Sequence, residues 1–390
     1  MSKTGISIKV SNTVMGTVPQ VNANSMLVVG GAVAAKSAPE GNVAFTLGMP
    51  FLFRSTDDLA AHGITDEDNH ELYRQVSDFY APVGGVNNTG TILWVVGVDT
   101  SKLTEVATNL KQWIRDTVAN GFQYRPRNIM LAGSIDTSKV TIEDFQKVID
   151  EMYTEGFATV GLIGGVVATN IDTLPSLATE NAGMVGVVII NNDVKQSKVA
   201  CVGLVGGYMA SLSVGTSIGD VSLTQIGTNF YFIDTKYTPC SAISLNQANT
   251  LGEKMYIFAR TRPPKNGLWF NDGATANDDT TALSTLEAAR TIASLVDDLR
   301  TFFTPFINSK VPCDSSGNIR ADYKTVVLTN AREQIIVPYI ESGDISDAAI
   351  DLRAVNDDMI GTRTWEVTLS ILPAPTLRWI DGYVFYVKSL

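Results

Sequence analysis

The chain has 390 residues, with 29 lysines and arginines against 40 aspartates and glutamates, so its net charge near pH 7 is −11. A surface of that sign repels phosphate backbones and anionic headgroups, which argues against nucleic acid and membrane surfaces as partners. Apolar residues make up 45% of the sequence, as in a globular protein long enough for two or three domains at roughly 100 to 200 residues each. No apolar run reaches the ~18 to 20 residues of a membrane span, and the three widely spaced cysteines favour free thiols in a reducing compartment.

The extreme N-terminus predicts a single strand. Ile6, Ile8 and Val10 alternate with polar residues, which is the period of two that a half-buried strand shows. Residues 12–24, which include Pro19, are rich in Asn, Thr and Gly without periodicity and predict a flexible connector. The first strand is therefore expected to be an arm outside the globular body.

Strand and helix patterns then alternate along the chain. Short apolar runs predict strands over residues 26–32, 91–98, 129–132, 158–163, 184–190 and 254–260. Between them, helices are predicted over residues 55–63, 72–80 and 199–214, and from Thr141 with Ile142, Phe145, Val148, Ile149 and Met152 on one face. This alternation predicts an α/β fold, a layered mixed sheet with helices.

The C-terminal third predicts helices followed by strands. A long helix begins at Ser284, and Pro305 should end or kink it. A second helix is expected over residues 323–339, ending near Pro338, and an acidic loop over 341–358. Residues 365–371 then alternate as a half-buried strand, and Pro373 and Pro375 break the run.

The final apolar segment has high strand propensity. Tyr383, Val384, Phe385, Tyr386 and Val387 are five consecutive aromatic or β-branched residues close to the end of the sequence. An unpaired strand of this kind recruits other chains. It can pair within its own subunit or, by β-augmentation, with the sheet of a neighbour, and we favour the second interpretation.

The residues that could carry chemistry do not form a recognised catalytic or metal motif. His62 and His70 flank an acidic run without metal-ligand spacing, so a solvated loop is the better interpretation. The glycine-rich runs 161–165 and 203–207 match no phosphate-binding pattern and indicate close packing. Residues 314–322 lack the final glutamate of a calcium loop and indicate a turn. We expect no enzyme activity, no cofactor and no metal.

Several of these segments resemble the contractile tail sheath family of phage tails and related bacterial contractile injection systems. The N-terminal resemblance is the order of a short helix, an aromatic-ended helix, a glycine-rich turn and a Leu-Trp-Val strand, over residues 55–63, 72–80, 84–90 and 93–98. The C-terminal resemblance is a strand, a proline break and a final apolar strand, over residues 365–371, 373–375 and 380–387. Residues 261–273 also resemble a segment of sheath-like proteins of bacterial injection systems.

The resemblance implies a structural subunit that polymerises helically around an inner tube protein, with baseplate and terminator proteins as further partners. Terminal strand arms exchanged between subunits would link the polymer, with Pro19, Pro373 and Pro375 as hinges, and contraction would drive the tube through a target envelope. The subunit would be made in the bacterial cytoplasm and assembled into a virion tail or an injection-system sheath. The alternatives are another self-assembling protein, such as a tube, capsid or surface-layer subunit, or an α/β enzyme with an unrecognised site.

The corresponding organisation has two domains and two arms. We expect an arm and connector over residues 1–24, the N-terminal part of the core over 25–100, a middle α/β region over 101–250, a C-terminal core region over 251–372 and a strand arm over 373–390.

Overall fold

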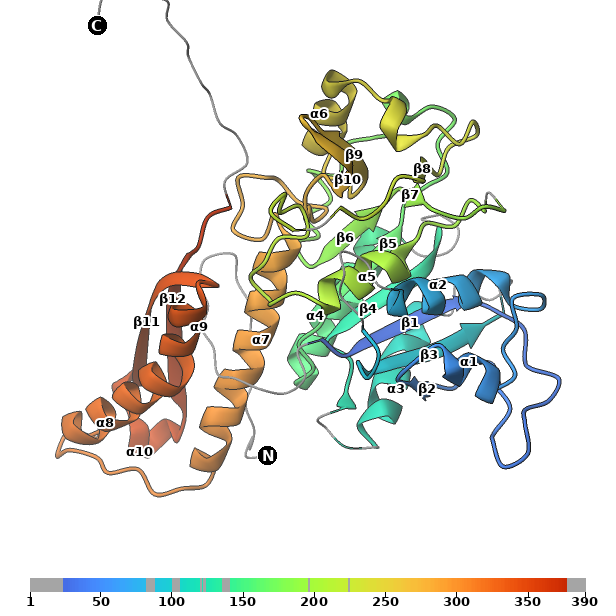
Figure 1. Ribbon diagram of the computed structural model, residues 1–390. Coiled ribbons are helices and arrows are strands. Elements are labelled where there is room, and N and C mark those ends of the chain that lie inside the picture. Colours follow the sequence, from blue (N-terminus) through green and yellow to red (C-terminus); the bar gives the residue numbers. More distant parts are fainter. Residues whose placement is uncertain are drawn as a thin grey trace, which may run out of the picture.

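The computed structural model describes residues 24–81, 88–99, 106–119, 121, 124–134, 141–195, 197–223 and 225–376 (Figure 1). Its largest sheet has six strands in the order β2-β3-β1-β4-β5-β6, parallel except for β2 at one edge. They are β1 (Met26–Gly31), β2 (Phe51–Phe53), β3 (Leu93–Val98), β4 (Asn128–Ser134), β5 (Val160–Gly164) and β6 (Val185–Val188). The mixed α/β architecture confirms the fold class predicted from the alternating pattern.

Helices cover both faces of this sheet. They are α2 (His70–Tyr80) and α5 (Val202–Ala210) on one face, and α3 (Val106–Val118) and α4 (Ile142–Glu155) on the other, while the short α1 (Asp57–Ala61) precedes α2. Side-chain contacts fix the sides, because Gly206 of α5 lies against Met130 and Phe145 of α4 lies against Gly161. Met130 pairs with Leu162, and Gly161 is the preceding residue of β5. Since successive residues of a strand face opposite sides, Met130 and Gly161 lie on opposite faces of the sheet.

Short elements that follow β6 form two further sheets of two strands each, β7 with β8 and β9 with β10, together with one helix. They are β7 (Ile190–Asn191), β8 (Tyr231–Phe232), α6 (Leu245–Glu253), β9 (Ala259–Arg262) and β10 (Lys265–Phe270). The strand predicted over residues 254–260 was placed too early, since β9 begins at Ala259. Met255 has a left-handed φ of 67°, and Ile257 joins β6 only through a single bridge to Val188, so the preceding residues do not form a regular ladder.

Helix α7 (Leu286–Phe303) links two separate hydrophobic clusters. The larger one contains the six-stranded sheet and includes Val296, whereas the smaller one begins one turn later at Leu299. As predicted, α7 ends before Pro305, which lies in a 3-10 turn over Thr304–Phe306. The smaller cluster lies under α8 (Ala321–Ala331), α9 (Val337–Ser342), α10 (Met359–Thr362), β11 (Ile345–Ala354) and β12 (Trp365–Pro373).

Two predictions in this C-terminal unit were wrong. The segment expected to be an acidic loop over residues 341–358 is mainly the strand β11, because its acidic residues alternate with buried ones and occupy the solvent face. The second helix continues past Pro338 to Ser342. A π-helical turn over Arg332–Ile336 precedes the proline, which occupies one of the first two positions of α9, where proline is tolerated.

Candidate functional site

The C-terminal hairpin forms a sheet of only two strands. Strands β11 and β12 pair antiparallel from Ile345 opposite Pro373 to Ala354 opposite Trp365, a length of about 30 Å at ~3.4 Å per residue. Among the described residues, no third strand pairs with either of them. An unpaired strand edge can accept an added strand. On β11 the Ala348 carbonyl already accepts a hydrogen bond from Arg332, and the Ala348 amide donates one to Asp347, so the edge of β12 is the less occupied of the two.

The two strands cover the underlying core unequally. On β11, the inward residues Ile345, Ala348 and Leu352 are buried, and α8 and α9 pack against this strand. The inward Ile350 of β11 is partly exposed. On β12, the inward residue Leu369 is buried, whereas Val367 and Ile371 remain partly exposed. The apolar layer under the hairpin is thus covered less completely on the β12 side.

The opposite face of the hairpin is polar and solvated. Arg353 pairs with Glu366 at 2.8 Å, and Asp351 pairs with Lys324 of α8 at 2.8 Å, with more than a third of the carboxylate side chains exposed. The hydrogen bond from Lys324 lowers the pKa of Asp351. Exposed pairs of this kind contribute little to stability. The face therefore has the character of a solvent surface, and the strand edges are the parts suited to a partner.

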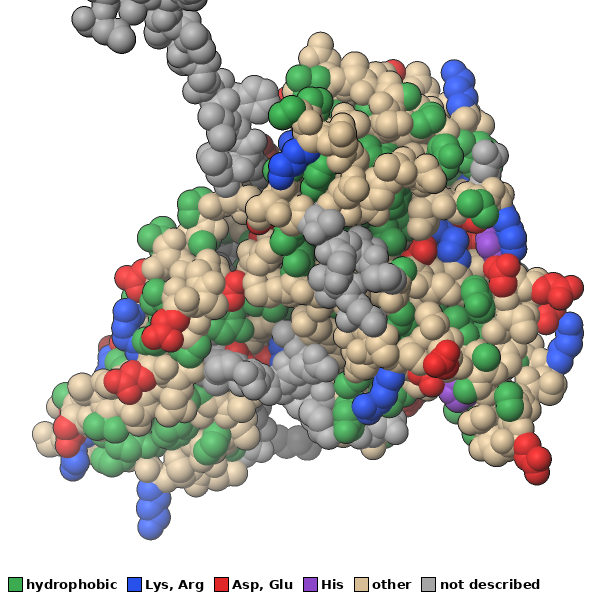
Figure 2. Space-filling view, in the orientation of Figure 1, with side chains coloured by type: hydrophobic (Ala, Val, Ile, Leu, Met, Phe, Trp, Pro, Cys, Tyr) green, Lys and Arg blue, Asp and Glu red, His purple; other side chains and the backbone are tan. Residues whose placement is uncertain are grey.

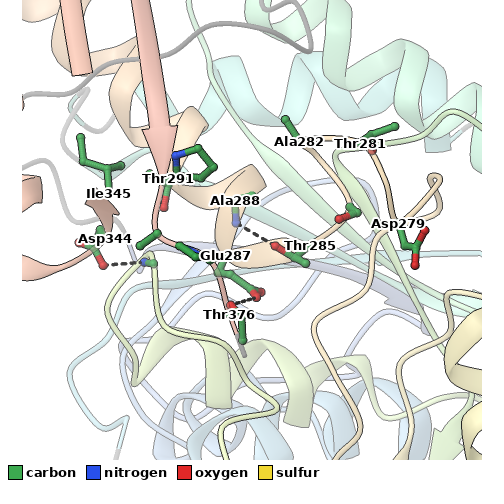
Figure 3. Close-up of a pocket in the computed structure, with 15 residues that line it drawn as sticks. Asp279, Thr281, Ala282, Thr285, Glu287, Ala288, Thr291, Asp344, Ile345 and Thr376 are labelled. Atoms are coloured by element: carbon green, nitrogen blue, oxygen red, sulfur yellow. Dashed lines mark hydrogen bonds between the residues drawn. The ribbon is translucent and has the colours of Figure 1, made fainter. Parts of the chain in front are cut away.

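A pocket of about 300 Å³ lies where the chain leaves β12 (Figure 3). Thr376 donates a hydrogen bond to Glu287 of α7 at 3.3 Å, and the Asp344 carboxylate, just before β11, accepts one from the Gly215 amide at 3.0 Å. Pro373, Ala374 and Pro375 complete this wall. The pocket is small and close to the lower limit for ligand sites.

A buried ionic cluster fastens α7 to the large sheet. Asp297 accepts a hydrogen bond from Arg125 and forms an ion pair with Arg127 at 2.9 Å, and both arginines precede β4. The three side chains are 4, 0 and 4% exposed, respectively. Burial lowers the pKa of Arg125 to about 10, against the opposing effect of Asp297. Nothing in the local sequence indicated this cluster, since Arg125 and Asp297 are 172 positions apart.

The predicted interface and hinge residues are only partly within the described chain. Pro373 is the last residue of β12, where its carbonyl accepts a hydrogen bond from Ser346 at 3.0 Å, and Pro375 follows it on the pocket wall. The other predicted residues lie outside the described part: Ile6, Ile8, Val10, Pro19, Tyr383, Val384, Phe385, Tyr386 and Val387.

The two histidines do not meet. His62 contacts the Val43 carbonyl at 2.7 Å, whereas His70 lies between Asp66 at 2.5 Å and Asp193 at 3.0 Å. Burial opposes protonation of His70, but the hydrogen bonds to Asp193 and Asp66 outweigh it and raise the pKa. Sequence reasoning missed Asp193 because it is 123 residues away. Within the described residues, no group of three or more His, Cys, Asp or Glu side chains is placed to hold a metal ion.

The glycine-rich runs do serve close packing. A Cβ at Gly161 would lie 2.5 Å from the Phe145 ring, and one at Gly207 would lie 2.4 Å from the Phe79 carbonyl oxygen. The segment predicted as a turn over residues 314–322 forms turns up to α8, which begins at Ala321, and in them Asp314 accepts hydrogen bonds from the amides of Ser316 and Asn318. None of the described helices is both long and apolar enough to cross a membrane.

The fold is shared with a solved structure of a large assembly. The chain superimposes with a TM-score of 0.60 and 12% identity, over 99% of both chains, on a chain in a cryo-EM structure of the 6-fold symmetrised anti-feeding prophage (AFP) baseplate. At this identity the likeness shows the fold alone. No curated protein sequence matches the chain.

The sequence itself matches a described family. Residues 4–274 match the family described as DUF2586, N-terminal domain, which is more than half of the chain. The matched part ends before α7, so the β11–β12 sheet lies beyond it. The chain belongs to the DUF2586 family.

Proposed function

We propose that this chain is the structural subunit of a contractile tail sheath, which polymerises helically around an inner tube and contracts to drive the tube through a target envelope. The observation that carries the proposal is the β11–β12 sheet, to which no third strand is added among the described residues. The same chain carries a strand-like sequence at each terminus, around Ile6–Val10 and Tyr383–Val387. It therefore has two candidate donors and two candidate acceptors for strand addition.

Strand addition between copies also explains the uneven covering of the core. A strand added along β12 would shield Val367 and Ile371, which are partly exposed in the single chain. Figure 2 shows hydrophobic side chains on the surface of the C-terminal unit that α8, α9, α10, β11 and β12 form. The exposed ones in this unit include Val326, Ile360 and Leu372. Since donor and acceptor are different surfaces, each link is heterologous, and the assembly extends as an open helix or closes as a ring.

The likeness to a chain of the anti-feeding prophage baseplate supports a structural component of a contractile injection system. It also makes a baseplate subunit the second candidate, which would close into rings rather than form long tubes. In either case we propose a non-enzymatic subunit made in the bacterial cytoplasm, with tube, baseplate and terminator proteins as partners. Pro19, Pro373 and Pro375 would act as hinges that let rigid bodies rearrange on contraction.

The test is negative-stain microscopy and sedimentation of the purified chain and of two truncations. One truncation lacks residues 1–11 and 381–390, which removes both strand-like sequences. The matched control lacks residues 1–4 and 388–390, which shortens both ends but keeps Ile6–Val10 and Tyr383–Val387.

Tubes from the full chain and the control, with monomers from the longer truncation, are the expected result. Closed rings of uniform size would favour the baseplate candidate. A folded monomer from all three proteins would contradict assembly by strand addition.

A further inference from the structure

Both ends of the described chain are fastened to the same turn of α7. Asn24, the first described residue of the N-terminal part, accepts a hydrogen bond from Arg290 at 3.4 Å. Thr376, the last described residue, donates one to Glu287 at 3.3 Å. Glu287 and Arg290 are three residues apart on one helix and are therefore neighbours on its surface. Asn24 and Thr376 are thus held at adjacent points of α7.

The side chains that hold these two ends are themselves tightly constrained. Arg290 is 3% exposed and also donates to the carbonyls of Leu212 and Ser213, at 3.2 and 3.3 Å. Glu287 is 7% exposed, and a Cβ on Gly273 would lie 2.8 Å from its carboxylate. Arg290 therefore cannot change its position without breaking its hydrogen bonds to these two carbonyls.

A second route joins the same points through the hairpin. The Asp344 carboxylate accepts hydrogen bonds from Ser213 and Gly215, in the loop that Arg290 holds. Asp344 directly precedes Ile345, which pairs with Pro373, and the chain then continues along the pocket wall to Thr376 (Figure 3). The contacts from Arg290 through the loop and the hairpin to Thr376 and Glu287 therefore form a closed ring, to which Asn24 is attached at Arg290.

We infer that the Glu287–Arg290 turn of α7 is a shared anchor, which couples the attachment of the N-terminal segment to that of the C-terminal segment. Its consequence for assembly rests on the proposed function: force applied by a neighbour through one arm would pass to the other arm through one helical turn. The two hydrophobic clusters would then remain undistorted. Thermodynamic coupling of this kind is reciprocal, so loosening either end must loosen the other.

The test uses hydrogen–deuterium exchange of the full-length protein, kept monomeric at low concentration. Thr376→Val removes the hydroxyl that bonds Glu287, and Asn24→Ala removes the acceptor of Arg290. Thr325→Val is the matched control, because it removes a 2.9 Å hydrogen bond from a threonine to the Ala321 carbonyl on α8, away from the anchor.

Each variant is expected to speed exchange about two- to five-fold in the segment that carries it, the effect of one lost hydrogen bond. A shared anchor also predicts at least about two-fold faster exchange at the opposite end, around residues 24–26 for Thr376→Val and residues 374–378 for Asn24→Ala. Effects confined to the substituted end, or absent from both ends, would overturn the inference. Because the readout is made on monomers, it stands or fails separately from polymer formation.

Discussion

The buried pairing of Asp297 with Arg125 and Arg127 provides the sharpest test of how the structure is held together. Asp297→Asn keeps the size of the side chain but removes the charge that two buried guanidinium groups share. Removing one partner of a buried ion pair costs about 3 to 5 kcal/mol, because the remaining charge is uncompensated. Since asparagine can still accept one hydrogen bond, we expect a loss at the lower end, about 3 kcal/mol.

The location of Asp297 gives this loss a structural consequence. It lies on α7 between Val296, in the large cluster, and Leu299, in the small one. We therefore expect the substitution to weaken the attachment of α7 to the sheet while leaving each hydrophobic cluster intact. For a cooperative unit of about 150 to 250 residues, ~3 kcal/mol lowers the melting temperature by roughly 6 to 12 °C.

The assay is urea denaturation followed by tryptophan fluorescence, together with a thermal melt. Glu366→Gln is the control, because its ion pair with Arg353 is exposed and should contribute little. Combining Asp297→Asn with Arg125→Met should cost less than the sum of the two, since each breaks the same contact. A loss under about 1 kcal/mol for Asp297→Asn would refute the reasoning, since it would mean that the guanidinium groups are solvated.

Two further predictions concern His70 on α2 and the glycines of α5 and α6. Contacts with Asp193 and Asp66 raise the pKa of His70 above 6.5 in the folded protein. The contribution of His70 to the free energy of unfolding is therefore fully present below about pH 6.5 and is lost as the pH rises through the folded-state pKa. Urea midpoints measured between pH 5 and 9 should therefore fall with pH more steeply than in His70→Gln, and parallel curves would contradict this. Gly207→Ala should destabilise by about 1 to 3 kcal/mol, because its Cβ would lie 2.4 Å from the Phe79 carbonyl oxygen. Gly252→Ala on α6 is the control, because no atom lies within 4 Å of the new Cβ, and it should instead stabilise the protein by about 0.4 to 1 kcal/mol. Equal changes in the free energy of unfolding at the two sites would contradict the packing argument.

The strands and helices with strong local patterns could be predicted from the sequence. The helix α4 begins after Thr141, whose side chain caps the Asp144 amide, and the α7 helix stops before Pro305, because capping and proline effects are local. Weak or mixed patterns failed for equally physical reasons. The acidic residues of β11 suggested a loop because its apolar residues include small alanines, which leave the strand period unclear until the other strand is known.

The sequence by itself determined the alternating α/β core, the negative charge, the strand-like character of the two termini and the proline breaks, since each depends on neighbouring residues. Only the tertiary structure decided that β11 and β12 form a separate sheet, that Asp297 meets two arginines, and that Asn24 and Thr376 reach one turn of α7. Those features join residues that are from about 10 to more than 260 positions apart. Contacts over such distances depend on how whole elements pack, and a single sequence carries no local signal for them.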